Sequence, residues 1–181
     1  MAELIYVDNS NLYIEARRVS AVARGMAKDI FDAMDNDILD HSYSIDFGKL
    51  YQFLTGGRDA EVKSCYLFGS RPPPNDTLWD IARSKGFNPV VEDRNVAGKE
   101  KKIDTGIVTK MMSDGYKFAD KTLDTITLVA GDSDYVRTIE QLREDGYENV
   151  ESVFWNHTSR ELKDAVTSFT SLNSHLDLLR L

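Results

Sequence analysis

Residues 125–143 constrain the fold more than any other part of the sequence, because they predict a complete strand, turn and helix. They read TITLVAGDSDYVRTIEQLR. Residues 125–130 are mostly β-branched or apolar, as in a strand that a parallel sheet buries on both faces. Val136, Ile139 and Leu142 then recur at the spacing of a helix. We therefore expect a buried strand, a tight turn and a helix.

Two acids, Asp132 and Asp134, lie in the turn of this unit. Ser133 or Asp134 can cap the helix by accepting a hydrogen bond from an unpaired backbone N–H. Capping explains one polar residue but leaves Asp132 without a role. Two carboxylates this close together repel each other unless a cation lies between them, so the pair indicates a divalent metal ion.

A similar arrangement lies near the N-terminus. The apolar run Leu4-Ile5-Tyr6-Val7 ends in Asp8, and Asn9-Ser10-Asn11 precede a helical pattern. Taken alone, this polar turn is explained by capping of the helix. Residues 131–134 repeat the arrangement, so we expect Asp8 to be a further acid at the end of a buried strand.

Strand patterns alternate with helical patterns along the rest of the chain. The other expected strands cover residues 62–68, 87–91 and 150–155. The apolar side chains of the last expected helix are Leu162, Ala165, Val166 and Phe169. This alternation predicts a parallel sheet with helices on both faces. We expect an α/β fold: a single three-layer α/β/α domain over residues 1–181 with a mainly parallel, five-stranded sheet.

Residues 25–46 fit this alternation poorly. Their apolar residues can line one side of a helix, whereas five of their six aspartates crowd the remainder. These are Asp29, Asp32, Asp35, Asp37 and Asp40. Such a run of charge is usually a solvated face and is a poor contact for phosphate. We therefore expect an acidic insertion at about residues 25–46 that serves either as a lid or as a surface for a protein partner.

The most basic short segment is residues 94–102, which contain a single acid, Glu100. Its cations are Arg94, Lys99, Lys101 and Lys102. The segment is either a solvated loop or a contact for phosphate groups.

Asp104 follows directly and opens a helix in which it shares a stripe with Ile107, Val108 and Met111. An acid in the first turn stabilises a helix through the helix dipole. Its place on the inward-facing stripe supports a second interpretation, in which Asp104 is another acid of a metal site.

The net charge of −8 counts against a broad electrostatic grip on nucleic acid. A metal-dependent nuclease can still carry such a charge, because the ion neutralises its acids and a short basic segment holds the phosphates. No apolar run is long enough to cross a bilayer, no signal peptide is recognisable, and Cys65 is a single cysteine. We expect a cytoplasmic protein that makes no membrane contact.

If the first and fourth strands are neighbours, Asp8, Asp132 and Asp134 meet beyond their carboxyl ends, where ligands of such sheets bind. Asp104 then completes the ring. Mg²⁺ or Mn²⁺ prefers oxygen ligands, polarises a phosphodiester and lowers the pKa of a bound water. Asn11 would orient a water or a phosphate. These residues indicate metal-assisted phosphodiester hydrolysis, and the sequence shows no zinc-binding histidine spacing, nucleophile elbow or Walker loop.

Three stretches resemble, in order and spacing, the signatures of the NYN domain in its LabA-like branch, within the PIN-like nuclease superfamily. They are VDNSNL at residues 7–12, KKIDTG at residues 101–106 and VAGDSDY at residues 129–135. The resemblance implies a PIN-like fold with the first and fourth strands of a five-stranded sheet at its centre. It also implies a ribonuclease that depends on Mg²⁺ or Mn²⁺.

On this resemblance, the metal-binding and catalytic acids are Asp8, Asp104, Asp132 and Asp134, with Asn11 and Ser133 as polar helpers. Two positions depart from the family pattern. Relatives often carry an acid at the position of Lys110, six residues after Asp104, and another near Thr167. Fewer outer acids favour a single bound ion, an altered substrate or lost activity.

We expect a metal-dependent endoribonuclease that hydrolyses RNA, or another single-stranded nucleic acid. A metal-bound water attacks the phosphodiester, and basic side chains hold the strand. These are Arg71, Lys99, Lys101 and Lys102. Two alternatives stay open. One is a catalytically weak RNA-binding or protein-binding regulatory module that uses residues 25–46 for a protein partner or a homodimer. The other is a metal-dependent phosphatase.

Overall fold

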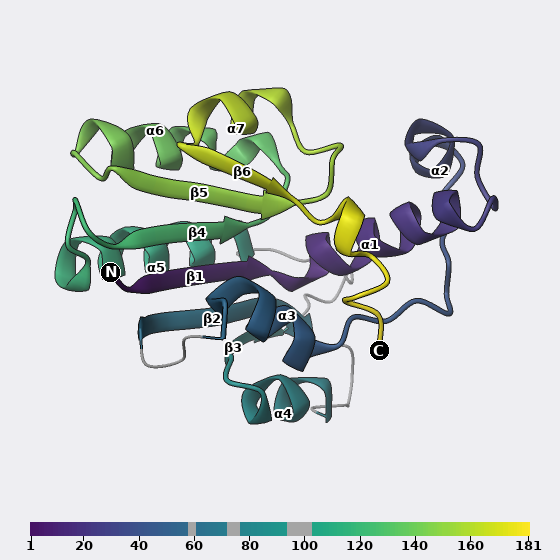
Figure 1. Cartoon of the computed structure of the whole chain (residues 1–181), viewed down its shortest axis with the longest axis horizontal. Helices are drawn as coiled ribbons and strands as arrows, with labels where there is room; N and C mark the ends of the chain where they lie inside the picture. The colour runs from purple at the N-terminus through teal and green to yellow at the C-terminus, as the bar shows by residue number, and fades with distance from the viewer. Residues whose placement is uncertain (58–60, 72–76, 94–102) are drawn as a thin grey trace.

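The structure, a computed structural model, describes residues 1–57, 61–71, 77–93 and 103–181. Within these residues the chain forms one sheet of parallel strands in the order β3-β2-β1-β4-β5-β6 (Figure 1). The strands are β1 (Glu3–Asp8), β2 (Val62–Arg71), β3 (Asn88–Asp93), β4 (Thr125–Val129), β5 (Asn149–Phe154) and β6 (Ser168–Ser171).

β1 lies in the middle of the sheet and separates two apolar clusters. Its successive side chains point to opposite faces, so Ile5 and Val7 join one cluster and Leu4 and Tyr6 join the other. The first cluster is covered by α1, α3 and α4, and the second by α5, α6 and α7 (Figure 1). The α/β fold with helices on both faces of a parallel sheet is thereby confirmed.

The helices on the first face are α1 (Asn9–Ala23), α3 (Phe47–Thr55) and α4 (Thr77–Ser84), and those on the second are α5 (Ile103–Phe118), α6 (Val136–Glu144) and α7 (Arg160–Ala165). The short α2 (Ile30–Asp35) packs against α1, and two 3₁₀ turns are η2 (Ser133–Tyr135) and η3 (Asn173–His175). No helix in the described ranges is both long and apolar enough to span a membrane.

The sheet has six strands, so the expected number of five is wrong by one. The sequence pattern assigned Phe169 to the last helix, but α7 ends at Ala165 and residues 168–171 pair with β5 as β6. Thr167 lies between α7 and β6 and ties the chain to β5. Its hydroxyl donates to the carbonyl of Val150 at 2.8 Å and accepts the N–H of Val150 at 3.0 Å. A strand of four residues is too short to show alternation, and its single apolar residue, Phe169, matched the helical spacing instead.

Residues 25–46 form α2 and an irregular return to the body of the protein. Asp29, Asp35 and Asp37 are exposed, as a solvated face predicts, but Asp40 is only 2% exposed. The Asp40 carboxylate accepts hydrogen bonds from Ser20 at 2.6 Å and from Arg24 at 3.1 Å. This part of the stretch is therefore anchored to α1. That residues 25–46 are an insertion stays a prediction.

The strand order reverses between β1 and β4, because the connection after β1 leads to β2 on one side and β4 follows on the other. Val7 pairs with Val129, so the two strands end side by side. In open parallel sheets this is the position at which a crevice forms for ligands. The predicted neighbourhood of the first and fourth strands is confirmed.

Candidate active site

Asp8 ends β1 at this crevice and is buried, with 6% of its surface exposed. It is also the N-cap of α1, because its Oδ1 atom accepts the backbone N–H of Asn11 at 3.0 Å. Its Oδ2 atom accepts a second hydrogen bond from the hydroxyl of Tyr135 at 3.2 Å. One oxygen of the Asp8 carboxylate therefore caps α1, and the other contacts Tyr135.

The hydroxyl of Tyr135 also lies 2.9 Å from Oδ1 of Asp104, which is in the first turn of α5. Burial, and then the charges of Asp8 and Asp104, raise the pKa of Tyr135 far above its usual range, so the phenol stays protonated. One hydroxyl has one proton, and it stands between two carboxylates. Two like charges that share one hydroxyl repel each other, and a cation between them would reduce this repulsion.

The turn after β4 is held by backbone contacts on both sides. The side-chain oxygen of Asn11 accepts the N–H of Gly131 at 3.1 Å, and the carbonyl of Gly131 accepts the N–H of Ser159 at 3.1 Å. A Cβ atom at Gly131 would lie 2.3 Å from the ring of Phe154, so this close approach requires glycine. Asn11 therefore ties the start of α1 to the acidic turn.

Asp132, Ser133 and Asp134 follow Gly131 at the same edge of the sheet, and their side chains are exposed. Asp132, rather than the expected Ser133 or Asp134, is the N-cap of η2: its Oδ1 atom accepts the N–H of Asp134 at 3.1 Å. Within the described ranges no three or more histidines, cysteines, aspartates or glutamates are grouped so that they could hold a metal ion. The expected ring of four acids stays a prediction: Tyr135 contacts Asp8 and Asp104, whereas Asp132 accepts a hydrogen bond within its own turn.

The predicted contacts for the RNA strand fall largely outside the described residues. Lys99, Lys101 and Lys102 belong to residues 94–102, and Arg71 is described only as the last residue of β2. Asp8 pairs with Phe68 of β2, so the backbone of Arg71 extends past the acid at the same edge of the sheet.

Two polar residues of this region were missed by the sequence analysis. Tyr135 was read only as the start of a helix, although a buried tyrosine needs a partner for its hydroxyl. Asn9 is also buried, and its side-chain oxygen has no hydrogen-bond partner within the described part of the chain. Because Asn9 follows Asp8 directly, its side-chain oxygen is an unsatisfied acceptor at the carboxyl ends of the strands. Its place in a polar turn concealed this burial.

Lys110, the residue at one often-acidic family position, has a structural partner. Its Nζ atom donates to Asp114 at 2.9 Å, and this hydrogen bond raises the pKa of Lys110. Asp114 is only 1% exposed and also accepts the hydroxyl of Tyr6 at 3.0 Å. The three residues join α5 to β1, and thereby fix the helix that carries Asp104.

The donor chemistry of the pair fits a hard divalent cation. Asp8 and Asp104 offer oxygen atoms alone, which is the ligand type that Mg²⁺ and Mn²⁺ prefer. Mg²⁺ usually takes one or two carboxylates and completes its shell with waters and substrate phosphates. A pair of acids joined by one hydroxyl proton is therefore sufficient for an ion of this kind.

A parallel three-layer α/β domain with acids at its central switch point is the architecture expected of PIN-like nucleases. The sequence matches the profile of the NYN domain over residues 4–173, and the chain belongs to this family. The NYN domain is a member of the PIN-like nuclease superfamily. No curated protein matches the sequence.

A crystal structure of a protein of unknown function from Vibrio parahaemolyticus has a similar fold. The TM-score is 0.67 and the identity is 18%, and the match covers 99% of this chain and 96% of the other. Identity this low shows likeness of fold alone.

Proposed function

We propose that this protein is a metal-dependent endoribonuclease of the LabA-like branch, which hydrolyses RNA phosphodiesters with the aid of Mg²⁺ or Mn²⁺. The proposal is supported chiefly by the single Tyr135 proton between Asp8 and Asp104 at the point where strand order reverses. An ion there would neutralise two like charges that the fold brings together.

In this mechanism, Asp8 and Asp104 hold the ion, and Tyr135 orients the two carboxylates. The bound ion supplies a water of lowered pKa and positive charge for the phosphate oxygens. Asn11 fixes the turn at Gly131 and so holds the acidic residues that follow at the mouth of the site.

Asp132 and Asp134 have a different role from Asp8 and Asp104. Both are exposed at the edge where substrate would enter. From there they can accept a proton from a water, or reach the ion through intervening waters. Ser133, exposed between them, offers a hydroxyl to a phosphate oxygen.

The substrate strand is held locally in this proposal, since the net charge of −8 opposes broad binding of nucleic acid. Arg71, at the end of β2, and the lysines of the basic segment, Lys99, Lys101 and Lys102, would contact phosphates. The same charge argument favours a single strand that enters the site over a long duplex bound along the surface. We further propose one domain over residues 1–181 that acts in the cytoplasm.

Cleavage of a labelled single-stranded RNA by the full chain tests the proposal. We expect cleavage to require Mg²⁺ or Mn²⁺ and to fall about 100-fold or more in Asp104→Asn, since even outer partners of metal sites cost 10–100-fold. The thermal shift caused by Mn²⁺ should disappear in the same variant. Asp164→Asn, which removes an exposed acid on α7, is the matched control. Cleavage that Asp104→Asn leaves unchanged refutes the proposed site.

A catalytically weak RNA-binding or regulatory module is the second candidate. It is favoured because the described residues contain no group of three or more acids, histidines or cysteines that could hold a metal ion. Binding of Mn²⁺ without cleavage of varied RNAs would support it. Turnover of a generic phosphomonoester, without cleavage of RNA, would instead identify a phosphatase.

A further inference from the structure

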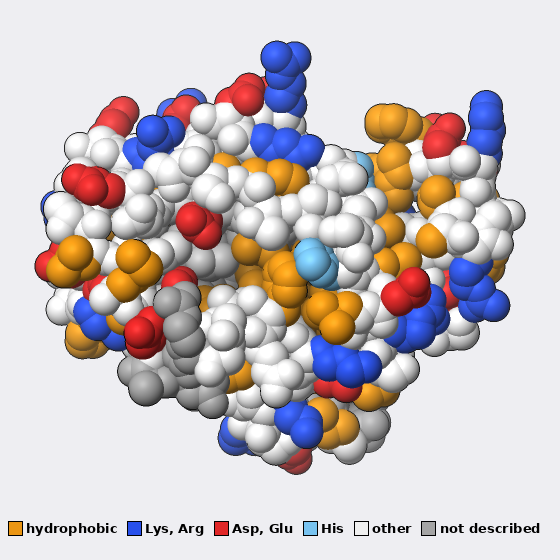
Figure 2. Space-filling view, in the orientation of Figure 1, with side chains coloured by type: hydrophobic (Ala, Val, Ile, Leu, Met, Phe, Trp, Pro, Cys, Tyr) orange, Lys and Arg blue, Asp and Glu red, His pale blue; other side chains and the backbone are white. Residues whose placement is uncertain are grey.

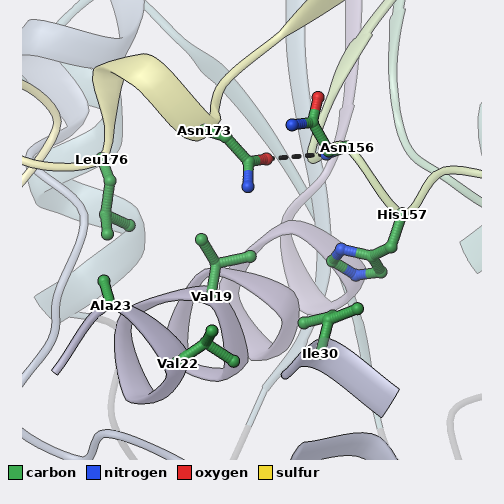
Figure 3. A pocket seen from close by; sticks show the side chains of 8 residues that line it. All are labelled: Val19, Val22, Ala23, Ile30, Asn156, His157, Asn173 and Leu176. Carbon is green, nitrogen blue, oxygen red and sulfur yellow. Dashed lines mark hydrogen bonds between the residues drawn. The ribbon is translucent and has the colours of Figure 1, made fainter. Parts of the chain in front are cut away.

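A pocket of about 220 Å³ lies at the opposite end of α1 from the acids, between that helix, α2 and the C-terminal part of the chain (Figure 3). Its apolar walls are Val19 and Val22 of α1, Ile30 of α2, and Leu176. Eleven residues separate Val22 from Asn11, which is roughly 16 Å along a helix axis at 1.5 Å per residue. The pocket is therefore separate from the proposed active site.

The polar residues at this pocket already have partners. His157 lies 2.6 Å from the Oε2 atom of Glu15 through its Nε2 atom, and the side-chain oxygen of Asn173 accepts the N–H of Asn156 at 2.7 Å (Figure 3). Glu15 is additionally paired with Arg18. The pocket consequently presents mainly apolar surface, which suits a hydrocarbon or aromatic side chain better than a polar metabolite.

α2 extends this apolar surface toward solvent. Only Ala33 of α2 is buried. Phe31 is 69% exposed and Met34 is 43% exposed, although both side chains are large and apolar. Met34 follows Ile30 by four residues, so the two share a face of α2. Figure 2 shows the molecule hollowed between the lobe of α2 and the body of the sheet, with apolar side chains facing the hollow. A large apolar side chain left exposed beside an apolar pocket indicates a contact surface.

Residues 28–37 carry four aspartates and one lysine, Lys28, so α2 and its flanks are negatively charged. Asp29, Asp32 and Asp35 belong to the N-cap and body of α2, and in the described part of the chain none forms an ion pair with a lysine or arginine side chain. Asp37 is paired with Arg18 at 3.4 Å. RNA would be repelled from this face, and a second copy of the chain would bring the same acidic helix against it. The complementary partner is therefore basic and apolar.

We propose that the pocket and α2 form a docking surface for a short segment of another protein, in which one large apolar side chain is flanked by lysines or arginines. The apolar side chain fills the space between Val22 and Ile30, as the central anchor of an interface does. The flanking cations lie against Asp29 and Asp35, which speed association and select the partner by charge. The inference is independent of the proposed nuclease activity.

Selection of short random peptides displayed on phage, with the full chain as bait, tests this proposal. We expect the selected peptides to share a large apolar residue flanked by lysine or arginine. Synthetic versions should shift the amide signals of Val19, Val22 and Ile30 in NMR spectra of the labelled protein. Their affinity should fall about fivefold in the Asp29→Asn/Asp35→Asn variant, because rim charges contribute modestly, and should also fall in high salt.

Two variants change this docking surface without touching the acids of the proposed active site. Val22→Glu places a charge inside it, and Phe31→Glu changes an exposed residue whose substitution leaves the core intact. We expect both to lose peptide binding and to keep RNA cleavage. Leu123→Glu, which changes an exposed apolar residue far along the chain, should bind peptide as the wild type does.

Four results would overturn the proposal. Selected peptides could lack the basic and apolar pattern, or bind Val22→Glu as well as wild type. Ultracentrifugation could show a dimer that Phe31→Glu dissociates, which would assign the surface to a second copy. RNA binding that Val22→Glu abolishes would assign it to nucleic acid.

Discussion

Tyr135 donates its hydroxyl toward Asp104 at 2.9 Å, and so links the turn after β4 to the first turn of α5. The same oxygen lies 3.2 Å from Asp8 at the end of β1. The hydroxyl oxygen of Tyr135 therefore brings together β1, the turn after β4 and the start of α5, which are far apart in the sequence. The relationship makes Tyr135 the residue through which Asp8 and Asp104 are held in a common geometry.

Tyr135→Phe should lower the free energy of unfolding by about 1–3 kcal/mol without metal, because a buried hydrogen bond to a charged acceptor is lost. Mn²⁺ should stabilise the variant more than the wild type, since the Tyr135 hydroxyl no longer offsets the like charges of Asp8 and Asp104. Chemical unfolding with and without Mn²⁺ measures both effects. Tyr147→Phe is the control, because its hydroxyl forms no hydrogen bond with the described residues. An equal effect of Mn²⁺ on the variant and the wild type would contradict this prediction.

Gly131→Ala should unfold at a lower temperature, with a loss of about 1–3 kcal/mol. The added Cβ would lie 2.3 Å from Phe154, which is fully packed and has no room to move. Gly106→Ala provides the contrast: its Cβ would come no closer than 3.6 Å to Phe68, and helix propensity favours alanine there. Calorimetry of the two variants should give shifts of opposite sign. A Gly131→Ala protein as stable as wild type would refute the close packing.

Asp40 should make stability depend on pH. Burial alone would raise its pKa, but hydrogen bonds from Ser20, Ser42 and Arg24 outweigh burial and hold the pKa well below its usual range. A depressed pKa gives stability that is present above the unfolded value of about 3.9 and is lost as pH falls below it. Asp40→Asn should therefore cost about 2 kcal/mol at pH 7, and about 1 kcal/mol less at about pH 3.

Urea unfolding at the two pH values measures the difference between wild type and Asp40→Asn. Asp164→Asn removes an exposed acid and should show almost no such dependence. If Asp40→Asn cost the same at both pH values, the carboxylate charge would not be the source of the stability.

Much of the fold was predictable because its strongest signals are local. The apolar runs at residues 4–7 and 125–130 are buried strands, and their adjacency followed from acids that recur at equivalent turns. β6 and the buried Asp40 were not predictable in the same way. A strand of four residues carries little periodicity, and Asp40 is buried by partners that are distant in sequence, such as Arg180 at 4.0 Å.

The candidate site was predictable in its location more than in its geometry. Asp8 and Asp104 come together as their positions at a strand end and a first helical turn implied. The orientation of Asp132 depended on a competition that the sequence does not resolve, between capping η2 and facing the crevice. The role of Tyr135 depended on three-dimensional contacts of a side chain that reads as ordinary core.

Lys110 and Asp114 give the last prediction. Lys110→Glu would set a like charge beside Asp114, which is buried. Removing one partner of a buried ion pair costs about 3–5 kcal/mol. Because the Lys110 side chain is 36% exposed, we expect a smaller loss of about 2 kcal/mol.

Equilibrium unfolding of Lys110→Glu, Asp114→Asn and the double variant forms the test. The double variant should lose less than the sum of the single losses, and strict additivity would show that the two residues do not act as a pair.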